Sequence, residues 1–485
     1  MGRLDRVYAG LPVPAQHAAV TAVGARWYWL RFGSGYADMV RGFAARDRFD
    51  ADQWRAWQAR TLRPLLGAAA ERVPHYRDTW DAEARAGARR GQLAAVPLLD
   101  KEPLRADPTR FLDPARLPSP RLGPIDLAAG RLLVFPTSGS SGTPVRTIWN
   151  ARELRASMAV REVRSAGWAG VSFRDPRATF SGRIIIPDPD SDGPFHRWNA
   201  IEHQVYFSTF HLRAENAEAY AAALREHEVV WATGYAQSFS RLGRYLLDAG
   251  GPRPRLRSVV ATSEKLTEAD RATIEEAFLC VVREEYSSIE NAVFASECEL
   301  GSLHVSPDAG VVEILRPDGT PTGPGEVGEV VATGFLRRLQ PLIRYRIGDL
   351  AAWSDEPCGC GRAMPVLAEV VGRVEDVLIG PDGRRVTRFH GVFYEIPGLI
   401  EAQIVQRSPR RFSVRVVVTD AFDEQGASVI IGRMIDRLGT AAEVSVDPVD
   451  AIERTAAGKF RAVVSELPSS EPPTSELPSS GPERG

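Results

Sequence analysis

Residues 135–146 read FPTSGSSGTPVR, a loop rich in hydroxyl side chains and glycines that follows a short apolar run. Gly139 and Gly142 let the backbone turn tightly, and the Ser and Thr hydroxyls add donors to the exposed N–H groups. Such a loop can wrap the oxygens of a polyphosphate. It is not a Walker loop, because Thr143 and Pro144 follow where that motif needs Lys and Ser or Thr. Alone, the stretch is more often an ordinary Ser/Gly loop.

The bulk composition describes a soluble, multi-domain protein. The chain has 485 residues, of which 44% are hydrophobic and 25% charged, so it can bury more than one core. Its net charge of -2 gives no strong field that would favour nucleic acid or an anionic membrane. The N-terminus, MGRLDRVYAGLPVPAQ, lacks the apolar core of a secretory signal, and no window resembles a membrane span. We therefore expect a cytoplasmic protein without nucleic-acid or membrane partners.

The pattern of apolar residues predicts an α/β fold with a separate α+β unit at the end. Residues 1 to about 95 read as helical, whereas short apolar runs then alternate with helices, as in LLVFPTSG, GRIIIPD, LRSVVATSE and GEVGEVVATGF. A helix is predicted over 266–279 with Thr267 as its N-cap. Beyond Val371 the segments VEDVLIGPDG, AQIVQRS and FSVRVVVTD read as strands, followed by a helix near 427–438.

These changes divide the chain into three parts. We predict a large domain over 1–371, a small domain over 372–465, and a disordered tail over 466–485 that repeats ELPSS and has no core-forming aromatics.

Lysine is rare in this chain. All but three of the 60 basic residues are arginines, and the lysines are Lys101, Lys265 and Lys459. Lysine is a compact point charge on a flexible stem, unlike the planar fork of arginine. A lysine that remains in such a background marks a position where arginine is a poor substitute, so Lys459 is a candidate functional residue.

Three of the four cysteines and one histidine form a candidate metal site. Cys298, His304, Cys358 and Cys360 are soft donors suited to structural zinc, and Gly359 would let the Cys-Gly-Cys segment fold around an ion. The spacing is not that of a standard zinc finger. The alternative is that Cys298 is a small core residue and Cys-Gly-Cys an incidental turn. Cys280 lies in an apolar run and is expected in the core.

Several motifs follow the loop in a fixed order. They are EEYSSIEN (284–291), RYRIGDL (344–350), VGRVED (371–376) and RTAAGKFR (454–461). With the loop, this succession resembles the adenylate-forming superfamily. Segments such as VPLLDKEPLR (96–105), PFHRWN (194–199), YFSTFHL (206–212), SECELGSLHV (296–305) and PCGCGR (357–362) resemble its phenylacetate–coenzyme A ligase-like branch, close to members from capsule-synthesis loci. The resemblance spans residues 7 to 465.

The resemblance implies a large adenylation domain, a small mobile domain that carries the catalytic lysine, and the following roles. The loop Thr137, Ser138, Gly139, Ser140, Ser141, Gly142 and Thr143 would hold the β- and γ-phosphates of ATP. Tyr286 would stack on adenine, Ser263 and Glu264 would border it, and Asp349 would accept from the ribose with Arg373 nearby. Glu290 would coordinate Mg²⁺, and Lys459 would bind the substrate carboxylate and the α-phosphate. The small domain would rotate about Glu375 or Asp376.

The implied reaction is AMP-forming activation of a carboxylic acid, followed by transfer to coenzyme A. An aromatic or compact acid is favoured, with Tyr235 at the acyl site and Phe207, Phe210 and Trp231 as further walls or as core residues. An amine, a hydroxyl or a carrier protein could equally accept the acyl group, and a homodimer is compatible with the resemblance.

Three positions depart from the superfamily pattern. Ser287 replaces a glycine and Ile289 a hydroxyl residue in the tyrosine motif, and Val145 follows the loop where a lysine is common. These departures keep open a third alternative, a nucleotide-binding protein without ligase turnover.

Overall fold

The structure is a computed structural model that describes most of the chain. The described residues are 3–117, 132–136, 145–188, 190–373, 377–383, 385–386, 389, 392–393, 396–455 and 458–467. The predicted phosphate loop Thr137 to Thr143, the pivot Glu375 and Asp376, and nearly all of the predicted tail lie outside them.

The chain divides into two compact units. The first comprises Met1–Val374 and Glu453–Phe460, and the second comprises Glu375–Ile452 and Arg461–Gly485. The stretch that carries Lys459 therefore packs with the first unit, although the residues on either side of it belong to the second. Among the described residues, no helix is both long and apolar enough to cross a bilayer.

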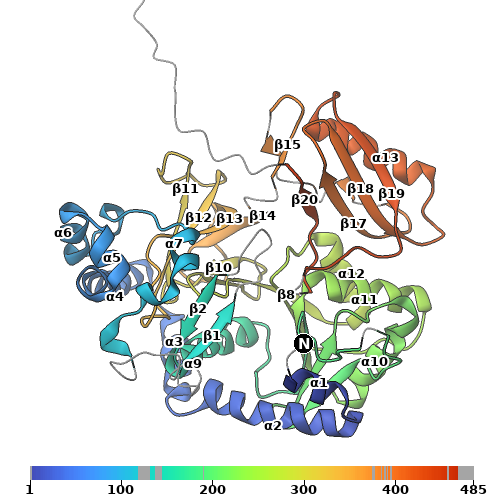
Figure 1. The fold of residues 1–485 in the computed structure, drawn as a ribbon, viewed down its shortest axis with the longest axis horizontal. Coiled ribbons are helices and arrows are strands. Elements are labelled where there is room, and N and C mark those ends of the chain that lie inside the picture. Colours follow the sequence, from blue (N-terminus) through green and yellow to red (C-terminus); the bar gives the residue numbers. More distant parts are fainter. Residues whose placement is uncertain are drawn as a thin grey trace, which may run out of the picture. The chain divides into compact units, whose positions relative to one another are not determined.

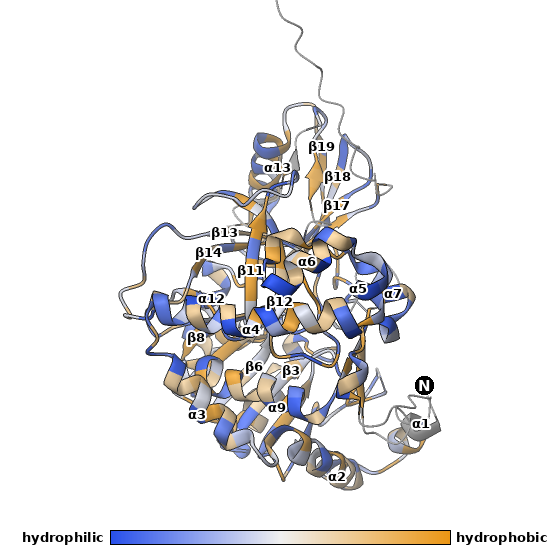
Figure 2. Ribbon diagram, turned by 90° about the vertical axis from the view of Figure 1, so that its left-hand side faces the viewer, coloured by the Kyte–Doolittle hydropathy of each residue, from blue (hydrophilic) through white to orange (hydrophobic). Residues whose placement is uncertain are grey.

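The first unit begins with helices and continues as a mixed α/β layer (Figure 1). Its α-helices are α1 (Arg3–Ala9), α2 (Val13–Phe32), α3 (Tyr36–Arg46), α4 (Ala51–Arg72), α5 (Pro74–Thr79), α6 (Ala82–Arg90), α7 (Lys101–Ala106), α9 (Ala151–Val160), α10 (Ala217–Glu226), α11 (Ala236–Ala249) and α12 (Glu268–Phe278). Short 3-10 or π turns lie at Leu93–Ala95, Pro108–Phe111, Pro114–Arg116, Arg161–Ala166 and Ala214–Asn216. In Figure 2 hydrophilic and hydrophobic residues share α3 and α4, as in amphipathic helices that cover a core.

A twelve-stranded sheet forms the centre of this unit. Its strand order is β11-β12-β13-β14-β10-β9-β8-β7-β6-β3-β5-β4. The strands are β3 (Arg177–Ser181), β4 (His196–Asn199), β5 (Gln204–Ser208), β6 (Trp231–Tyr235), β7 (Ser258–Thr262), β8 (Val281–Ser287), β9 (Phe294–Glu297), β10 (Leu303–Val305), β11 (Gly310–Leu315), β12 (Val327–Gly334), β13 (Tyr345–Trp353) and β14 (Val366–Arg373). A separate pair, β1 (Leu133–Pro136) and β2 (Arg146–Trp149), flanks the loop outside the described residues. The mixed α/β class predicted from the sequence is confirmed.

The sheet changes direction at β8. Strands β5, β3, β6, β7 and β8 run parallel, whereas β9 to β14 pair antiparallel. Helices α10, α11 and α12 lie side by side (Figure 1) and connect parallel strands. Helix α12 begins after Thr267, whose hydroxyl accepts from the N–H of Asp270 at 3.1 Å, which confirms the predicted cap. In open sheets of this kind, ligands bind beyond the carboxyl ends of the parallel strands.

The strand predicted at GRIIIPD is wrong. Strand β3 ends at Ser181, before this segment, and residues 182–188 are irregular. Ile185 and Ile186 are buried, and the carbonyl of Ile185 accepts from the Tyr8 hydroxyl at 2.9 Å rather than from a neighbouring strand. Apolar, β-branched residues thus pack into the core without forming a ladder.

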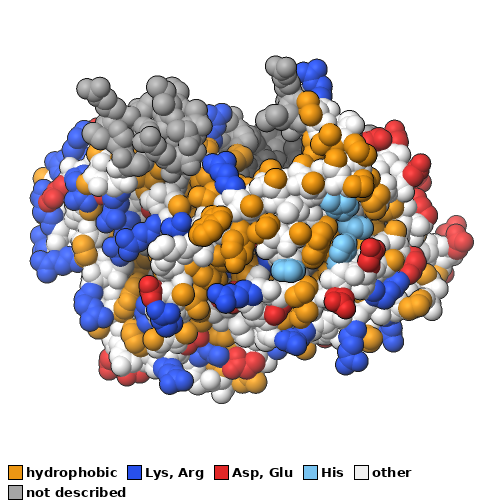
Figure 3. All heavy atoms as spheres, turned by 90° about the horizontal axis from the view of Figure 1, so that it is seen from below, with side chains coloured by type: hydrophobic (Ala, Val, Ile, Leu, Met, Phe, Trp, Pro, Cys, Tyr) orange, Lys and Arg blue, Asp and Glu red, His pale blue; other side chains and the backbone are white. Residues whose placement is uncertain are grey.

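A histidine of α2 is hydrogen-bonded to the edge strand β4, and two further histidines lie nearby. The Nδ1 atom of His17 accepts from the N–H of Trp198 at 2.8 Å, and the Nε2 atoms of His196 and His227 lie 3.2 Å apart. Figure 3 shows histidines grouped on one face among apolar side chains. Burial lowers the pKa of all three, that of His196 to about 4, so they pack as neutral rings near pH 7.

The second unit is a small α+β layer. A four-stranded sheet of order β19-β18-β17-β20 contains β17 (Leu399–Gln406), β18 (Arg411–Val418), β19 (Glu443–Pro448) and β20 (Val463–Ser465), and a short hairpin contains β15 (Leu378–Ile379) and β16 (Arg385–Val386). Ile430, Met434 and Leu438 of α13 (Glu424–Leu438) are buried in one core with strand residues such as Ile404.

Gly234 on β6 lies very close to the backbone of β3. Its φ is +145°, and a Cβ there would stand 1.8 Å from the carbonyl oxygen of Phe180 on β3. Any side chain would force these two strands apart just before Tyr235.

Gly234→Ala is therefore expected to lower the free energy of unfolding by about 3 kcal/mol, through steric overlap and backbone strain. Urea unfolding followed by tryptophan fluorescence measures this. Gly67→Ala is the control, because a Cβ on Gly67 in α4 meets nothing within 4 Å and alanine favours helix. Equal stability of the two variants would contradict the role of Gly234.

Candidate active site

The carboxyl ends of the parallel strands bring several predicted site residues to one edge of the sheet. Tyr235 ends β6, Glu264 follows β7, and Tyr286 lies near the end of β8 with Glu290 four residues later. Ser263 has a left-handed backbone, with φ +69°. Such strain is typical of functional sites.

Asp349 is held by two of the other predicted residues. Its Oδ2 accepts from the Tyr286 hydroxyl at 2.8 Å, and its Oδ1 lies 3.0 Å from Nε of Arg373. Asp349 and Arg373 face each other across β13 and β14. Burial raises the pKa of Asp349, while Arg373 and the hydrogen bond from Tyr286 oppose this shift. The carboxylate, itself on β13, is thus fixed in position by neighbours on β8 and β14.

Glu290 is buried beside this group. Its Oε1 accepts from the Tyr345 hydroxyl at 3.0 Å, and its backbone carbonyl accepts from Arg337 at 2.9 Å. The other carboxylate oxygen has no hydrogen-bond partner among the described residues. Burial lowers the pKa of Arg337 to about 10 although Glu153 and Glu290 lie nearby. A carboxylate with one oxygen free can take a divalent cation.

Residues 458–460 lie against the same site. The N–H of Phe460 donates to Oε1 of Glu264 at 2.8 Å, and the N–H of Gln237 donates to its Oε2 at 3.0 Å. A Cβ on Gly458 would stand 2.6 Å from Cα of Gly182 and 3.1 Å from the ring of Phe210. Only glycine permits this approach, and it places Lys459 against the ends of β3 and β5.

Lys459 is half-buried among charged groups of the site. Burial and the charge of Arg373 lower its pKa, and Glu264, Asp349 and Glu290 act in the opposite direction. Three predicted carboxylates, Glu264, Asp349 and Glu290, therefore lie within electrostatic reach of this lysine. The structure brings together Lys459, Glu264, Glu290, Asp349 and Arg373.

Other predicted residues fall into different surroundings. Tyr235 is buried, and burial raises the pKa of its hydroxyl, opposed by a hydrogen bond with the backbone at Gly182. Trp231 and Phe207 belong to the core, whereas Phe210 is 40% exposed beside Gly458. Of the three aromatics considered as acyl-pocket walls, only Phe210 therefore has a surface to offer.

The tyrosine motif contains the hydroxyl of Ser288, which was not predicted as a site residue from the sequence. Ile289, at the position where a hydroxyl residue is usual, is 44% exposed. The hydroxyl of the preceding Ser288 is buried and has no hydrogen-bond partner among the described residues.

Three further residues lie near the site but were not predicted from the sequence as functional residues. Tyr345 and Arg337 hold Glu290, and Nζ of Lys101 lies 2.7 Å from the point where a Cβ on Gly348 would stand. The rarity of lysine is the signal that marked Lys101, and Tyr345 lies within the quoted RYRIGDL motif.

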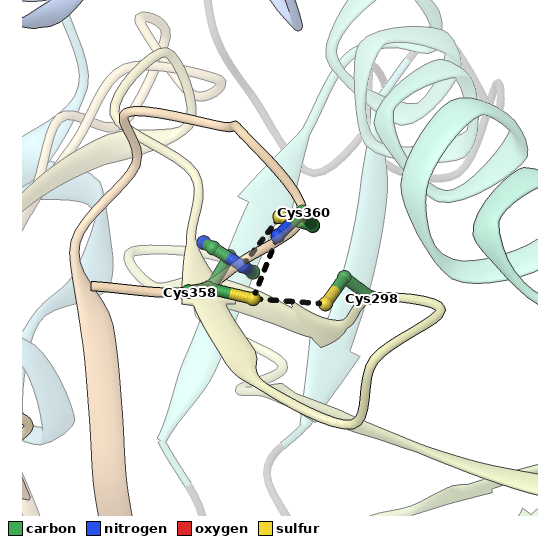
Figure 4. A group of neighbouring side chains, drawn as sticks. Cys298, Cys358 and Cys360 are labelled. Carbon is green, nitrogen blue, oxygen red and sulfur yellow. Dashed lines mark hydrogen bonds between the residues drawn. The ribbon is translucent and has the colours of Figure 1, made fainter. Parts of the chain in front are cut away.

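The predicted metal ligands come together in a second cluster, apart from these carboxylates in the chain. The donor atoms of Cys298, His304, Cys358 and Cys360 all lie within 4.8 Å of one another (Figure 4). The sulfurs of Cys298 and Cys358 are 3.6 Å apart, and Sγ of Cys360 is 3.3 Å from Nε2 of His304. Tetrahedral zinc with thiolates at 2.3 Å separates sulfurs by about 3.8 Å. The donor set therefore fits zinc in kind, number and spacing.

The surroundings of this cluster orient its donors. Nδ1 of His304 lies 3.2 Å from the carbonyl oxygen of Met364, a contact that places the proton on Nδ1 and leaves Nε2 for a metal. The N–H groups of Leu300 and Cys360 donate to the sulfurs of Cys298 and Cys358. These hydrogen bonds stabilise thiolates.

Comparison with known proteins agrees with this architecture. Residues 378–466 match the family model of the CapK C-terminal domain. Protein CapK of Staphylococcus aureus is 26% identical over 343 residues, 70% of this chain and 75% of that protein. A phenylacetate-coenzyme A ligase of Thermus thermophilus is 30% identical over 239 residues, 43% of this chain and 54% of that enzyme. The crystal structure of 2-hydroxyisobutyryl-CoA ligase in complex with 2-HIB-AMP has a TM-score of 0.63 and 20% identity, and covers 87% of this chain and 92% of its own.

The fold is thus that of the adenylate-forming acyl-CoA ligases. By sequence, the chain is homologous to CapK and to the phenylacetate-coenzyme A ligases, and the resemblance inferred from the motifs is confirmed.

Glu264 gives the site a measurable dependence on pH. Burial raises the pKa of this carboxyl to about 7 from its usual 4.5, although the N–H groups of Phe460 and Gln237 and nearby cations oppose the shift. Between pH 4.5 and 7 the folded protein therefore binds more protons at Glu264 than the unfolded chain, so stability contributed here falls as pH rises.

Relative to Glu264→Gln, the wild-type protein should lose about 2 kcal/mol of unfolding free energy between pH 5 and pH 8. Urea titrations of both proteins at the two pH values measure the difference. Glu276→Gln, an exposed substitution on α12, is the control and should track the wild type at both. A Glu264→Gln difference that does not change with pH would refute the shifted pKa.

Proposed function

We propose that the protein uses ATP to activate a carboxylic acid as an acyl-adenylate and then transfers the acyl group to coenzyme A. The observation that carries this proposal is the convergence of Lys459, Asp349, Glu290 and Arg373 at the carboxyl ends of the parallel strands. The homologous phenylacetate-coenzyme A ligases and the fold shared with a ligase that binds 2-HIB-AMP support the same reaction.

In the first step, an oxygen of the acid attacks the α-phosphorus of ATP and the bond to pyrophosphate breaks. Two anions must approach, so the step needs fixed positive charge. We assign this charge to Lys459, whose ammonium would bind the acid carboxylate and the α-phosphate. Mg²⁺ bound through the free oxygen of Glu290 would add charge neutralisation at the phosphates. In the second step the thiol sulfur attacks the acyl carbonyl, gives up its proton, and AMP leaves.

The remaining predicted residues would bind the nucleotide and the acid. Asp349, held by Tyr286 and Arg373, would accept from the ribose hydroxyls, with the ring of Tyr286 and the segment Ser263–Glu264 beside adenine. The loop Thr137 to Thr143 would hold the β- and γ-phosphates, and the buried hydroxyl of Ser288 is a donor available close to Glu290. Tyr235 and Phe210 would line the acyl site, which favours a compact or aromatic acid.

Lys459→Ala should reduce acid-dependent exchange of pyrophosphate into ATP by about 100- to 1,000-fold, because it removes the charge on the reacting groups. Exchange is measured with a panel of aromatic and short aliphatic acids. Lys265→Ala is the matched control, because this substitution changes the net charge by the same amount. Lys265 itself pairs with Glu369 at 2.6 Å. Full exchange in Lys459→Ala would overturn the role of that lysine.

An assay without coenzyme A distinguishes the possible acceptors of the acyl group. Acyl-adenylate that accumulates without coenzyme A and disappears when it is added supports thioester formation. Consumption only by an amine, a hydroxyl compound or a carrier protein would replace coenzyme A as acceptor. ATP binding without AMP release for any acid would contradict the ligase proposal.

We further propose that Cys298, His304, Cys358 and Cys360 hold one structural zinc ion. Protein purified without chelators should contain about one zinc per chain by elemental analysis. Cys358→Ser should lose the metal and lower the melting temperature, because the cluster joins β9, β10 and the segment before β14. Cys280→Ala, outside the cluster, should keep it. Metal-free wild-type protein of unchanged stability would contradict this site.

A further inference from the structure

Helix α7 is fixed beside the strand that carries Asp349. Leu99 pairs with Tyr345 in a parallel bridge, in which the N–H of Leu99 donates to Arg344 at 2.9 Å and its carbonyl accepts from Arg346 at 2.9 Å. This bridge extends the large sheet next to β13. Lys101, two residues further on, consequently stands next to Gly348.

Helix α7 presents cations to the site at four-residue spacing. Lys101 acts electrostatically on Asp349, and Arg105, one turn later, acts on Tyr345, whose hydroxyl binds Glu290. Residues four apart share one helix face. Arg105 is held in an ion pair with Glu102, at 2.9 Å. Half-buried Lys101 has neither an ion pair nor a side-chain hydrogen bond within the described part of the chain.

Two cations lie around Gly348. Nζ of Lys101 and Nη1 of Arg373 lie 2.7 and 4.0 Å from the same point, the position of a Cβ on Gly348. Asp349 is the carboxylate close to both, and it is already bound by Arg373 and Tyr286. Cations in one partly buried site repel each other unless an anion lies between them or beside them. A small, flexible ammonium suits an oxyanion whose position changes during a reaction.

We propose that Lys101 binds a phosphate group of the nucleotide, so that α7 supplies a cation to the site in addition to Lys459 and Arg373. The inference rests on the proposed function, because it takes the bound anion to be ATP. It assigns a ligand contact to a residue outside the motifs that define the site, and it gives a reason for the retention of a second lysine in an arginine-rich chain.

Calorimetric titration of ATP, AMP and adenosine into the wild type and the Lys101→Ala variant tests this proposal. Loss of a hydrogen bond between charged groups should weaken ATP binding by about 10- to 100-fold and leave adenosine binding unchanged. If AMP binding weakens as much as ATP binding, the contact is to the α-phosphate; if only ATP binding weakens, it is to the β- or γ-phosphate. Unchanged ATP binding, or an equal loss for adenosine, would overturn the inference.

Matched variants remove the alternative explanations. Lys101→Met keeps the apolar stem and should reproduce the loss, whereas Lys101→Arg should recover part of it. Lys265→Ala should bind ATP as the wild type does. If the wild type itself binds no ATP, the proposed function fails; if it binds ATP and Lys101→Met binds equally well, only the role of Lys101 fails. A melting temperature close to that of the wild type shows that each variant is folded.

Discussion

The buried carboxylate of Asp349 is the constraint on which the candidate active site depends. A charge taken out of water is tolerated only where neighbouring groups compensate it. Here Tyr286 binds one oxygen and Arg373 the other, and these residues come from β8 and β14, on either side of the middle of the large sheet. The carboxylate therefore connects strands that are distant in sequence. Its negative charge also attracts Lys101 and Lys459.

The strand arrangement explains why these groups meet. The sheet turns from parallel to antiparallel at β8, so the chain leaves the parallel half with Tyr286 and Glu290 and returns through β13 with Asp349. Close approaches at Gly234 and Gly458 bring the backbone in tightly enough for Tyr235 and Lys459 to reach the same edge. Local glycine positions and global topology thus determine one site together.

Much of this could be predicted from the sequence, because several elements carry local signals. The Thr267 cap, the alternation of strands and helices, and the ordered motifs each depend on neighbouring residues, and they led to the correct fold class and family resemblance. The segment GRIIIPD misled because Ile185 and Ile186 fill the core without pairing in a strand. The place of Lys101 could not be predicted, since it depends on a bridge between Leu99 and Tyr345, nearly 250 residues apart. The cysteine cluster lay between these cases: the donor types were evident, but only the packing of β9, β10 and β14 shows their distances.

The scarcity of lysine also has a chemical consequence. Amine-directed reagents can modify only three side chains in this protein, and two of them act on the same carboxylate, Asp349. The third is held by Glu369. The pattern of acylated amines would therefore act as a nearly background-free footprint of this one site, a property that a protein with an ordinary number of surface lysines does not have.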